Sequence, residues 1–477
     1  MTTISENRLL VDLPAEVAGE ILHSWLGLPS LVRVDSAHCS HHDRPILLNL
    51  LASHTSNSKS YVHLINAGCA KWLTMRRIQF SDVDITAEFP EVSRYLRFCP
   101  KIQRVWCSSG GAVDQISINC RNLNSLVCTS FNMGPNFNSY NANLQDLRML
   151  NVKKLTTSLF EDVQLPELAT LSFFRTICDD ALVGSVVRMT SVLQQIDVGL
   201  CQNFTDAGLI AVAQQCPLLR SVGLRGLQLS NGALAELTQL CPLIELINLQ
   251  GNYMLTDAGV LTLTKSATRL TSICISYCTA LTDKSLKHLT THSATTFHTL
   301  HMLDMTQVHV NVLVRLLKKC TRLHTLVLNC DLSVHFADVI PHMYRLQTLA
   351  VYAMIYDKEL CAIARYLKQL ERLSILCTDK VDSVAPSNAT NAAMHCARVE
   401  ATMNDARYSE VGLYELMQGL PSLRLLVAKE LFTQNDHTWC EVTTVNLVRY
   451  LWQRLRPNIQ FGTDDIAFRF SVFCDDM

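Results

Sequence analysis

The densest group of side chains that could bind a metal ion lies near the amino terminus. His38, Cys39, His41, His42 and Asp43 follow one another closely there. Zinc sites in proteins pair two such ligands a few residues apart with a second pair further along the chain. The next histidines are isolated, so no second pair of this kind follows. We therefore interpret the group as a polar turn, and we predict no metal site.

The sequence also lacks the motifs of the common catalytic sites. Gly110 and Gly111 form an isolated pair without the lysine that completes a phosphate-binding loop. No Gly-x-Ser-x-Gly segment marks a hydrolase nucleophile. The 19 cysteines recur in many turns, whereas a cysteine nucleophile is expected as a single residue with a partner histidine. These observations favour a chain that is not an enzyme and needs no cofactor.

An internal repeat determines the elements to which these residues belong. The pattern apolar-x-x-apolar-x-apolar begins at Leu193, Leu219, Ile244 and Leu270, and these starts lie about 25 residues apart. Further copies begin, in chain order, at Met75, Ile102, Leu123, Leu144, Leu168, Leu300, Leu323, Leu346, Leu370 and Leu423. The long gap before the last copy contains a small, polar segment that is typical of an inserted loop.

Each copy predicts a short strand, a turn and a helix. The alternating apolar positions indicate a strand with one buried face, and the apolar spacing then becomes helical. In one copy Thr205 or Asp206 can cap the helix, and Cys216 with Pro217 can end it. Neither the strand nor the helix can bury its apolar face alone, so neighbouring copies must stack.

Composition argues against several classes of partner. The chain has 41 basic and 42 acidic residues without long basic runs, so we expect no nucleic-acid partner and no membrane-surface binding. No stretch approaches the roughly 18 apolar residues needed to span a bilayer. The polar start of the chain lacks the pattern of a secretory signal. We therefore expect a cytoplasmic or nuclear protein, or one present in both compartments, with reduced and buried cysteines.

The copies resemble the cysteine-containing subtype of leucine-rich repeats. The residues that carry this resemblance are Cys201, Thr205, Asp206, Leu209, Thr256, Asp257, Val260, Cys278, Leu281, Thr282, Asp283 and Leu286. The resemblance implies an α/β fold, a right-handed leucine-rich-repeat solenoid of horseshoe shape. Stacked repeats of this kind usually bind their partners on the concave face.

A short helical module precedes the repeats. Asp12 before Leu13 and Pro14 is typical of a helix start, and apolar residues then follow at helical spacing. The segment resembles an F-box, the motif that docks on the Skp-family adaptor of cullin–RING ubiquitin ligases. The matching residues are Leu13, Pro14, Glu16, Ile21, Leu22, Leu26, Leu31 and Val34. The alternative is a helical cap that covers the open edge of the first repeat.

The order of the two resemblances implies a function by analogy. F-box proteins often carry leucine-rich repeats after the motif, so we expect a substrate-recognition subunit of an SCF-type E3 ubiquitin ligase. Its partners would be the Skp-family adaptor, a cullin and an unidentified target protein. The adaptor contacts implied are Leu13, Pro14, Ile21, Leu22, Trp25 and Leu31. The alternative is a leucine-rich-repeat scaffold for protein interactions with no ligase role.

Strand alternation also predicts which side chains a target would contact. Residues beside the last two apolar positions of each copy should point into the concave face. These candidates are Asp197, Arg225, Asn248, Gln250, Ser276, Asp304, Asn329 and Tyr352. Their mixed charges fit a protein partner, and arginine and tyrosine are common in interface hot spots.

The predicted domain organisation has four parts. Residues 8–50 form the F-box-like module, and 51–72 a linker. The solenoid covers 73–450, with an insertion at about 378–407, and 451–477 form a carboxyl-terminal cap or tail. An inserted loop on a solenoid is either a tolerated surface feature or a contact to the partner, and both alternatives remain open.

Overall fold

The computed structural model describes residues 33–34, 43–53, 55–56, 62–64, 67–77, 79–85, 95–97, 99, 101–108, 116, 119–129, 143–153, 155, 160, 164–329, 336–351, 355, 357–376, 415–416, 418–423, 425–429 and 460–462. The chain divides into two compact units, Met1–Leu219 and Arg220–Met477. We refer to them as unit 1 and unit 2.

Unit 1 contains mostly strands in its first half and alternating strands and helices afterwards. Its elements are α3 (Asp43–Ser53), β1 (Thr55–Ser56), β2 (Val62–Leu64), α4 (Ala67–Arg76), β3 (Gln79–Phe80), β4 (Asp82–Ile85), β5 (Arg104–Cys107), β6 (Ser125–Thr129), β7 (Asp146–Leu150), β8 (Thr170–Ser172), α7 (Asp180–Val187), β9 (Gln195–Asp197) and α8 (Asp206–Gln215).

Unit 2 alternates strands and helices over most of its described length. Its elements are β10 (Ser221–Gly223), α9 (Asn231–Leu240), β11 (Leu246–Asn248), α10 (Asp257–Ser266), β12 (Ser272–Cys274), α11 (Asp283–His292), β13 (Thr299–Met302), α12 (Val310–Lys319), β14 (Thr325–Leu328), α13 (Phe336–Val339), η3 (Ile340–His342), β15 (Thr348–Val351), α14 (Asp357–Tyr366), β16 (Arg372–Leu376), β17 (Leu425–Lys429) and β18 (Gln460–Gly462).

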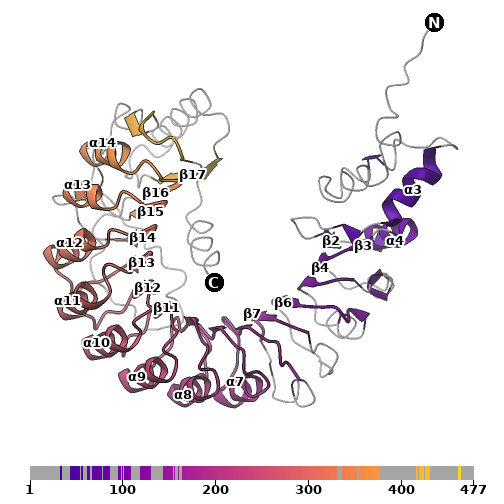
Figure 1. Ribbon diagram of the computed structural model, residues 1–477, viewed down its shortest axis with the longest axis horizontal. Helices are drawn as coiled ribbons and strands as arrows, with labels where there is room; N and C mark the ends of the chain where they lie inside the picture. The colour runs from indigo at the N-terminus through magenta and orange to yellow at the C-terminus, as the bar shows by residue number, and fades with distance from the viewer. Residues whose placement is uncertain are drawn as a thin grey trace, which may run out of the picture. The chain divides into compact units, whose positions relative to one another are not determined.

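Successive repeats place their strands side by side in a parallel sheet. In unit 1 the order is β2, then β4 to β9, with β1 paired separately to β3. In unit 2 the order is β10 to β18. Parallel neighbours need a crossover, and in unit 2 helices supply it along one face of the sheet (Figure 1). This is the stacked strand–turn–helix architecture that the repeat predicts, and the sheet already includes β2, inside the segment predicted as a linker.

The core forms between the strands and the helices. The three apolar positions are buried in most of the described copies, as in Ile244, Ile247 and Leu249, and Ile247 pairs in register with Val222 and Ile273. Adjacent helices such as α10 and α11 contact each other as well. Each repeat therefore buries its apolar surface against its neighbours, as the stacking argument requires.

Two predicted copies begin at the wrong residue. Met75 lies in α4 with an exposed side chain, and the strands that follow, β3 and β4, bury Phe80, Val83 and Ile85. Apolar residues three apart also occur on a helix face, which explains this error. Leu300 pairs with Ile273, so it is the second apolar position of its copy and the buried Phe297 is the first.

A residue with left-handed backbone conformation follows the strand in each of seven repeats. In unit 2 the amide groups of Gly226, Gly251 and Tyr277 donate to the carbonyls of Gln250, Ser276 and Leu303 in the next repeat, at 2.7, 2.9 and 2.7 Å. Hydrogen bonding between repeats therefore continues past the strands. The seven residues, with φ between 55° and 71°, are Asn151, Arg175, Leu200, Gly226, Gly251, Tyr277 and Asp304.

In several repeats the side chain of the residue after this turn position forms a hydrogen bond to the previous repeat. In unit 2 the side-chain amide of Asn252 donates to the carbonyls of Leu224 and Leu249, at 2.8 and 2.9 Å. Cys278 donates to the Leu249 carbonyl at 3.0 Å, and in unit 1 Cys201 donates to Phe173 at the same distance. Burial raises the pKa of Cys278 to about 12, so its thiol stays protonated. The predicted role of the repeat cysteines in packing is thus confirmed at these positions.

The amino-terminal ends of the helices form a second set of hydrogen bonds between repeats. Asp257, the first residue of α10, accepts hydrogen bonds from the amide and hydroxyl groups of Thr282 at 2.9 and 2.6 Å, and from Ser285. Asn231, at the same place in α9, makes the matching pair of bonds to Thr256. The first helical residue of one repeat therefore fixes the helix cap of the next.

Acid should weaken the bonds that Asp257 makes, and the Asp257→Asn variant tests this. Partial burial raises the pKa of Asp257, but the hydrogen bonds from Ser285 and Thr282 outweigh it and hold the pKa below its usual 3.8. The unfolded chain then takes up a proton first, so this stabilisation is present at neutral pH and is lost as the pH falls below about 4.

We expect Asp257→Asn to match the wild type closely at pH 7, because Asn231 bonds the corresponding groups of Thr256, accepting from its amide and donating to its hydroxyl oxygen. As the pH falls, the urea midpoint of the wild type should decline more than that of the variant. Parallel pH profiles for the two proteins would contradict the assignment.

Candidate binding surface

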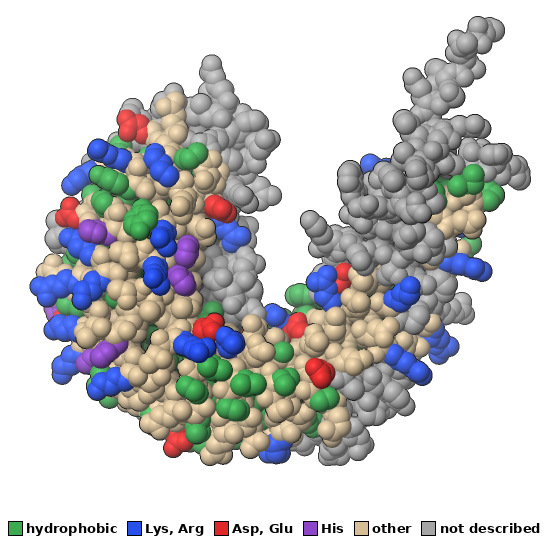
Figure 2. Space-filling model, viewed as in Figure 1, with side chains coloured by type: hydrophobic (Ala, Val, Ile, Leu, Met, Phe, Trp, Pro, Cys, Tyr) green, Lys and Arg blue, Asp and Glu red, His purple; other side chains and the backbone are tan. Residues whose placement is uncertain are grey.

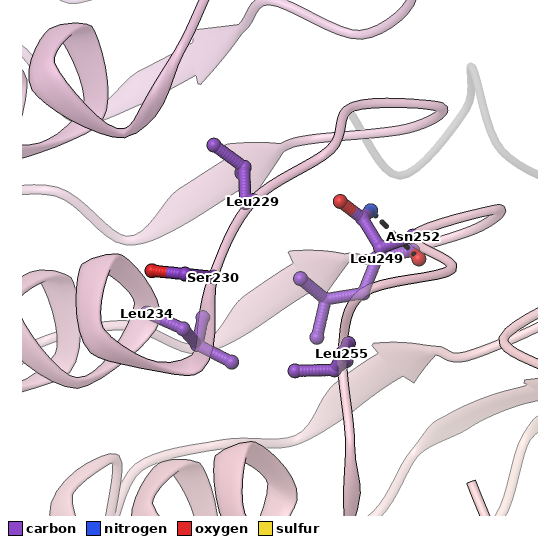
Figure 3. A pocket seen from close by; sticks show the side chains of 6 residues that line it. All are labelled: Leu229, Ser230, Leu234, Leu249, Asn252 and Leu255. Atoms are coloured by element: carbon purple, nitrogen blue, oxygen red, sulfur yellow. Dashed lines mark hydrogen bonds between the residues drawn. The ribbon is translucent and has the colours of Figure 1, made fainter. Parts of the chain in front are cut away.

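The described residues hold no metal-binding cluster and one small apolar pocket worth noting. No group of three or more His, Cys, Asp or Glu side chains in this part of the chain could hold a metal ion. Leu229, Leu234, Leu249 and Leu255 line a space of about 10 Å³ beside Asn252 (Figure 3). That volume is at the lower limit for one water molecule and too small for a cofactor. None of the described helices is long and apolar enough to cross a bilayer.

The structure gives structural roles to several residues predicted to contact a target. The carboxylate of Asp197 in β9 accepts a hydrogen bond from the amide of Gly199 at 2.9 Å. Asn248 in β11 accepts one from the amide of Gln250 at 3.0 Å and is only 4% exposed. Both side chains form the local turn in which Asp and Asn commonly hydrogen-bond two residues on.

Other predicted contacts link neighbouring repeats. Ser276 is 1% exposed and accepts a hydrogen bond from the amide of Leu303 at 2.9 Å. Asn329 accepts one from the amide of Asp304 at 2.9 Å. Asp304 occupies the left-handed turn position and not the strand-face position predicted for it, because its copy begins three residues earlier than predicted, at Phe297.

The remaining predicted contacts divide into two groups. Arg225 and Gln250 are half-buried on unit 2. Tyr352 and the predicted adaptor contacts lie outside the described residues. These adaptor contacts are Leu13, Pro14, Ile21, Leu22, Trp25 and Leu31.

The strand face of unit 1 presents an aromatic residue that the sequence analysis did not select. Trp106 in β5 lies between the buried Val105 and Cys107, and its side chain is 37% exposed. It pairs in register with Asp84 of β4 and Val127 of β6. Because Val105 and Cys107 face the core, Trp106 faces the opposite side of the sheet.

Two arginines lie on the same face of the sheet as Trp106, one on β5 and one on β7. Arg104, two residues earlier and half-exposed, forms an ion pair with the buried Asp82 of β4. On β7, Arg148 pairs with Asp146 at 2.9 Å, and Asp146 also accepts a hydrogen bond from Ser125 of β6 at 3.0 Å. These bonds hold both arginine side chains in place on the strand face.

A partly exposed tryptophan near fixed arginines is typical of a protein-binding hot spot, where Trp and Arg are enriched. We call Trp106, Arg104 and Arg148 the tryptophan patch. The sequence contained the signal, because Trp106 lies between the second and third apolar positions of the copy that begins at Ile102. It was missed because the candidates were taken from the more regular repeats after residue 190.

Trp106→Ala should remove the largest side chain of the tryptophan patch while leaving the core intact. We expect about a tenfold or greater loss of target capture, the usual effect of truncating a hot spot. Ile177→Ala is the matched control, because Ile177 is 42% exposed in the same unit but lies in a turn. The measurement is quantitative capture of partner proteins by each variant, with folding checked by circular dichroism. Equal capture by the two variants would exclude the tryptophan patch.

The parallel sheet, the helical crossovers and the asparagine or cysteine bonded back to the previous repeat define a leucine-rich-repeat solenoid protein. Such a protein binds partners through rows of side chains contributed by successive repeats.

Comparison with known proteins adds a relative. No family model matches the chain. The chain is similar to F-box/LRR-repeat protein 4 of Bos taurus, with 24% identity over 298 residues. The match covers 54% of this chain and 45% of the relative, so it spans less than half of the relative's length. It confirms the resemblance to F-box and leucine-rich-repeat proteins that the sequence analysis identified.

Two solved structures are also similar to the chain. The TLR13–ssRNA13 complex shows 13% identity and a TM-score of 0.42, covering 80% of this chain and 50% of that one. The yeast Rad7–Elc1 complex shows 15% identity and a TM-score of 0.46, covering 98% and 100%. Both scores are below 0.5, and the fold assignment rests on the strand register and the repeat bonds.

Proposed function

We propose that the chain is a substrate-recognition subunit of an SCF-type cullin–RING ubiquitin ligase. The observation that carries this proposal is the similarity to F-box/LRR-repeat protein 4. The amino-terminal residues with F-box-like spacing support it, because they precede the repeats in the order expected of such a subunit. Under this proposal the protein works in the cytoplasm, in the nucleus or in both.

The two parts of the chain would have separate roles. The segment with F-box-like spacing around Leu13, Ile21 and Trp25 binds the Skp-family adaptor through these apolar residues, and the adaptor links the chain to a cullin. The strand face of the repeats, with the tryptophan patch, binds the target protein. The chain itself makes and breaks no bond. It raises the effective concentration of the target beside the catalytic subunits of the ligase.

Direct binding to purified Skp-family adaptor tests the proposal. We expect the intact chain to bind, and Leu13→Asp/Ile21→Asp to lose at least about tenfold in affinity, because two buried apolar contacts would become charged. Trp106→Ala is the matched control and should bind the adaptor normally. If the folded wild-type chain does not bind, the protein is a leucine-rich-repeat scaffold without a ligase role.

A further inference from the structure

The parallel architecture of unit 2 places two different kinds of segment at its two edges. Every described strand runs in the same direction, so the segments that lead from a helix to the next strand share one edge. The segments that lead from a strand to the next helix share the opposite edge. We call the first of these the helix-to-strand edge.

Cationic side chains gather along the helix-to-strand edge between α10 and β15. Figure 2 shows Lys, Arg and His side chains spread over this face of unit 2. Each of the side chains used in the argument is exposed. They are Lys265, Arg269, Lys318, Lys319, Arg322 and Arg345.

The helix-to-strand segments that carry these side chains contain no acidic residue. Residues 265–272, 292–298, 318–325 and 342–348 contain neither Asp nor Glu. The nearest carboxylates on this edge are Glu245, before β11, and Glu371, before β16. Glu245 already forms an ion pair with Arg220 at 2.6 Å. The helix-to-strand segments between these two positions contain no acidic residue, whereas the flanking segments together mix acidic and basic residues.

Helix stability explains part of this charge but not all of it. Lys265, Lys318 and Lys319 occupy the last turns of α10 and α12, where cations offset the negative end of the helix dipole. Arg269, Arg322 and Arg345 lie beyond the helix ends, in the turns just before the strands. None of the three forms an ion pair with a carboxylate in the described part of the chain, and Arg345 lies over the ring of Tyr344 at 5.7 Å.

A pair of histidines lies between the cationic stretch and the strands. The rings of His298 and His324, just before β13 and β14, lie 5.1 Å apart. Burial lowers the pKa of His324, and the charges of His298 and Arg345 lower it further. The two imidazoles are thus close enough to contact one ligand.

We infer that the helix-to-strand edge of unit 2 binds a short, extended, acidic peptide segment of a partner protein. Arg322 and Arg345 hold equivalent positions before neighbouring strands, since Leu326 pairs with Leu349. Neighbouring strands lie about 4.8 Å apart, so the four strands from β12 to β15 span roughly 14 Å. An extended peptide covers that distance with about four residues.

The length of the stretch favours a peptide over a nucleic acid. Even a single DNA-binding module buries roughly 600 Å² or more of protein surface and follows the phosphates of a long backbone. Here the four strands from β12 to β15 span only roughly 14 Å, a short track for such a backbone. Clustered arginines recognising an acidic segment are a recurring mode of peptide binding. This inference does not depend on adaptor binding.

The test uses the full-length chain and a fluorescein-labelled octapeptide of alternating Asp and Glu, with binding followed by fluorescence anisotropy. We expect saturable binding that weakens with salt, and no binding of the matching Asn and Gln peptide. Arg322→Glu/Arg345→Glu should bind at least about tenfold more weakly. The affinity of the milder Arg322→Gln/Arg345→Gln variant should lie between those of the wild type and the charge-reversal variant. This variant replaces the charge-reversal variant if the latter does not fold.

The matched control is Lys284→Glu/Lys358→Glu, which makes the same change of charge at exposed sites on the opposite edge. It should keep wild-type affinity to within about twofold. Three results would overturn the inference: no binding of the acidic peptide, equal loss in both charge-reversal variants, or tighter binding of oligothymidylate than of the peptide.

Discussion

Asn252→Ala should lower the free energy of unfolding by about 1–3 kcal/mol, because it leaves the buried Leu224 carbonyl without its side-chain donor, while the Leu249 carbonyl keeps the bond from Cys278. The Asn252 side chain is 1% exposed and bonds to the carbonyls of both Leu224 and Leu249. Water has little access to replace these bonds. Urea denaturation of the full chain, followed by circular dichroism, measures the loss as a shift of the transition that reports on unit 2.

Comparing the stability of Asn252→Cys with that of Asn252→Ala tests whether the hydrogen bonds are the cause. Cysteine fills the equivalent position at 201 and 278 and donates to one carbonyl of the preceding repeat. We therefore expect Asn252→Cys to be clearly more stable than Asn252→Ala and less stable than wild type. If alanine and cysteine proved equally stable at this site, the hydrogen bonds would not be the source of the effect.

Gly259→Ala should destabilise the protein by about 1–3 kcal/mol, the usual cost of overpacking. A Cβ atom on Gly259 would overlap the side chains of Asn231 and Leu255. Asn231 is the residue that fixes the cap of α10 through Thr256, so moving it also weakens those bonds. Thermal denaturation of the variant and the wild type provides the comparison.

Gly232→Ala is the control for this prediction. Gly232 lies in the first turn of α9, and a Cβ there would meet only the Ser230 hydroxyl oxygen at 3.5 Å, an ordinary contact. Alanine is also the better helix former, so this variant should equal the wild type or exceed it by up to about 1 kcal/mol. A loss of stability in Gly232→Ala as large as in Gly259→Ala would show that steric overlap is not the cause.

Local patterns in the sequence were sufficient to predict the repeating elements. Apolar spacing placed the strands that bury Leu193, Ile244 and Leu270, and polar residues marked the helix starts. Thr205 caps α8 by accepting a hydrogen bond from the amide of Ala207 at 3.2 Å. The helix ends where the cysteine before Pro217 predicted. Each of these features depends on neighbours within a few residues.

Features that depend on the pairing between repeats could not be predicted in the same way. The spacing around Leu300 fits two strand registers, and only pairing with Ile273 selects one. Asp197 and Asn248 alternate as surface residues should, yet both bond to their own turns. The cations on the helix-to-strand edge come from segments far apart in the sequence, so no single run of basic residues predicts them.

The tryptophan patch could be predicted only in part, because it also depends on pairing between strands. The position of Trp106 between two core residues could be predicted from the sequence, but the ion-paired arginines near it could not. Asp82 and Asp146 fix Arg104 and Arg148 on the strand face, and the first of these bonds needs two neighbouring strands in register. In the regular repeats, polar strand residues such as Asp197 and Asn248 bond to their own turns, so these repeats gave poor candidates for target contacts.

The central claim is that two separate parts of the chain bind an adaptor and a target. The most direct test compares the proteins that co-purify with tagged wild type, Leu13→Asp/Ile21→Asp and Trp106→Ala, quantified by mass spectrometry. We predict that adaptor and cullin accompany the wild type and Trp106→Ala but not the double variant, while a different set of proteins is lost only from Trp106→Ala. Absence of adaptor and cullin from the folded wild-type sample, or loss of the same proteins from both variants, would contradict the account.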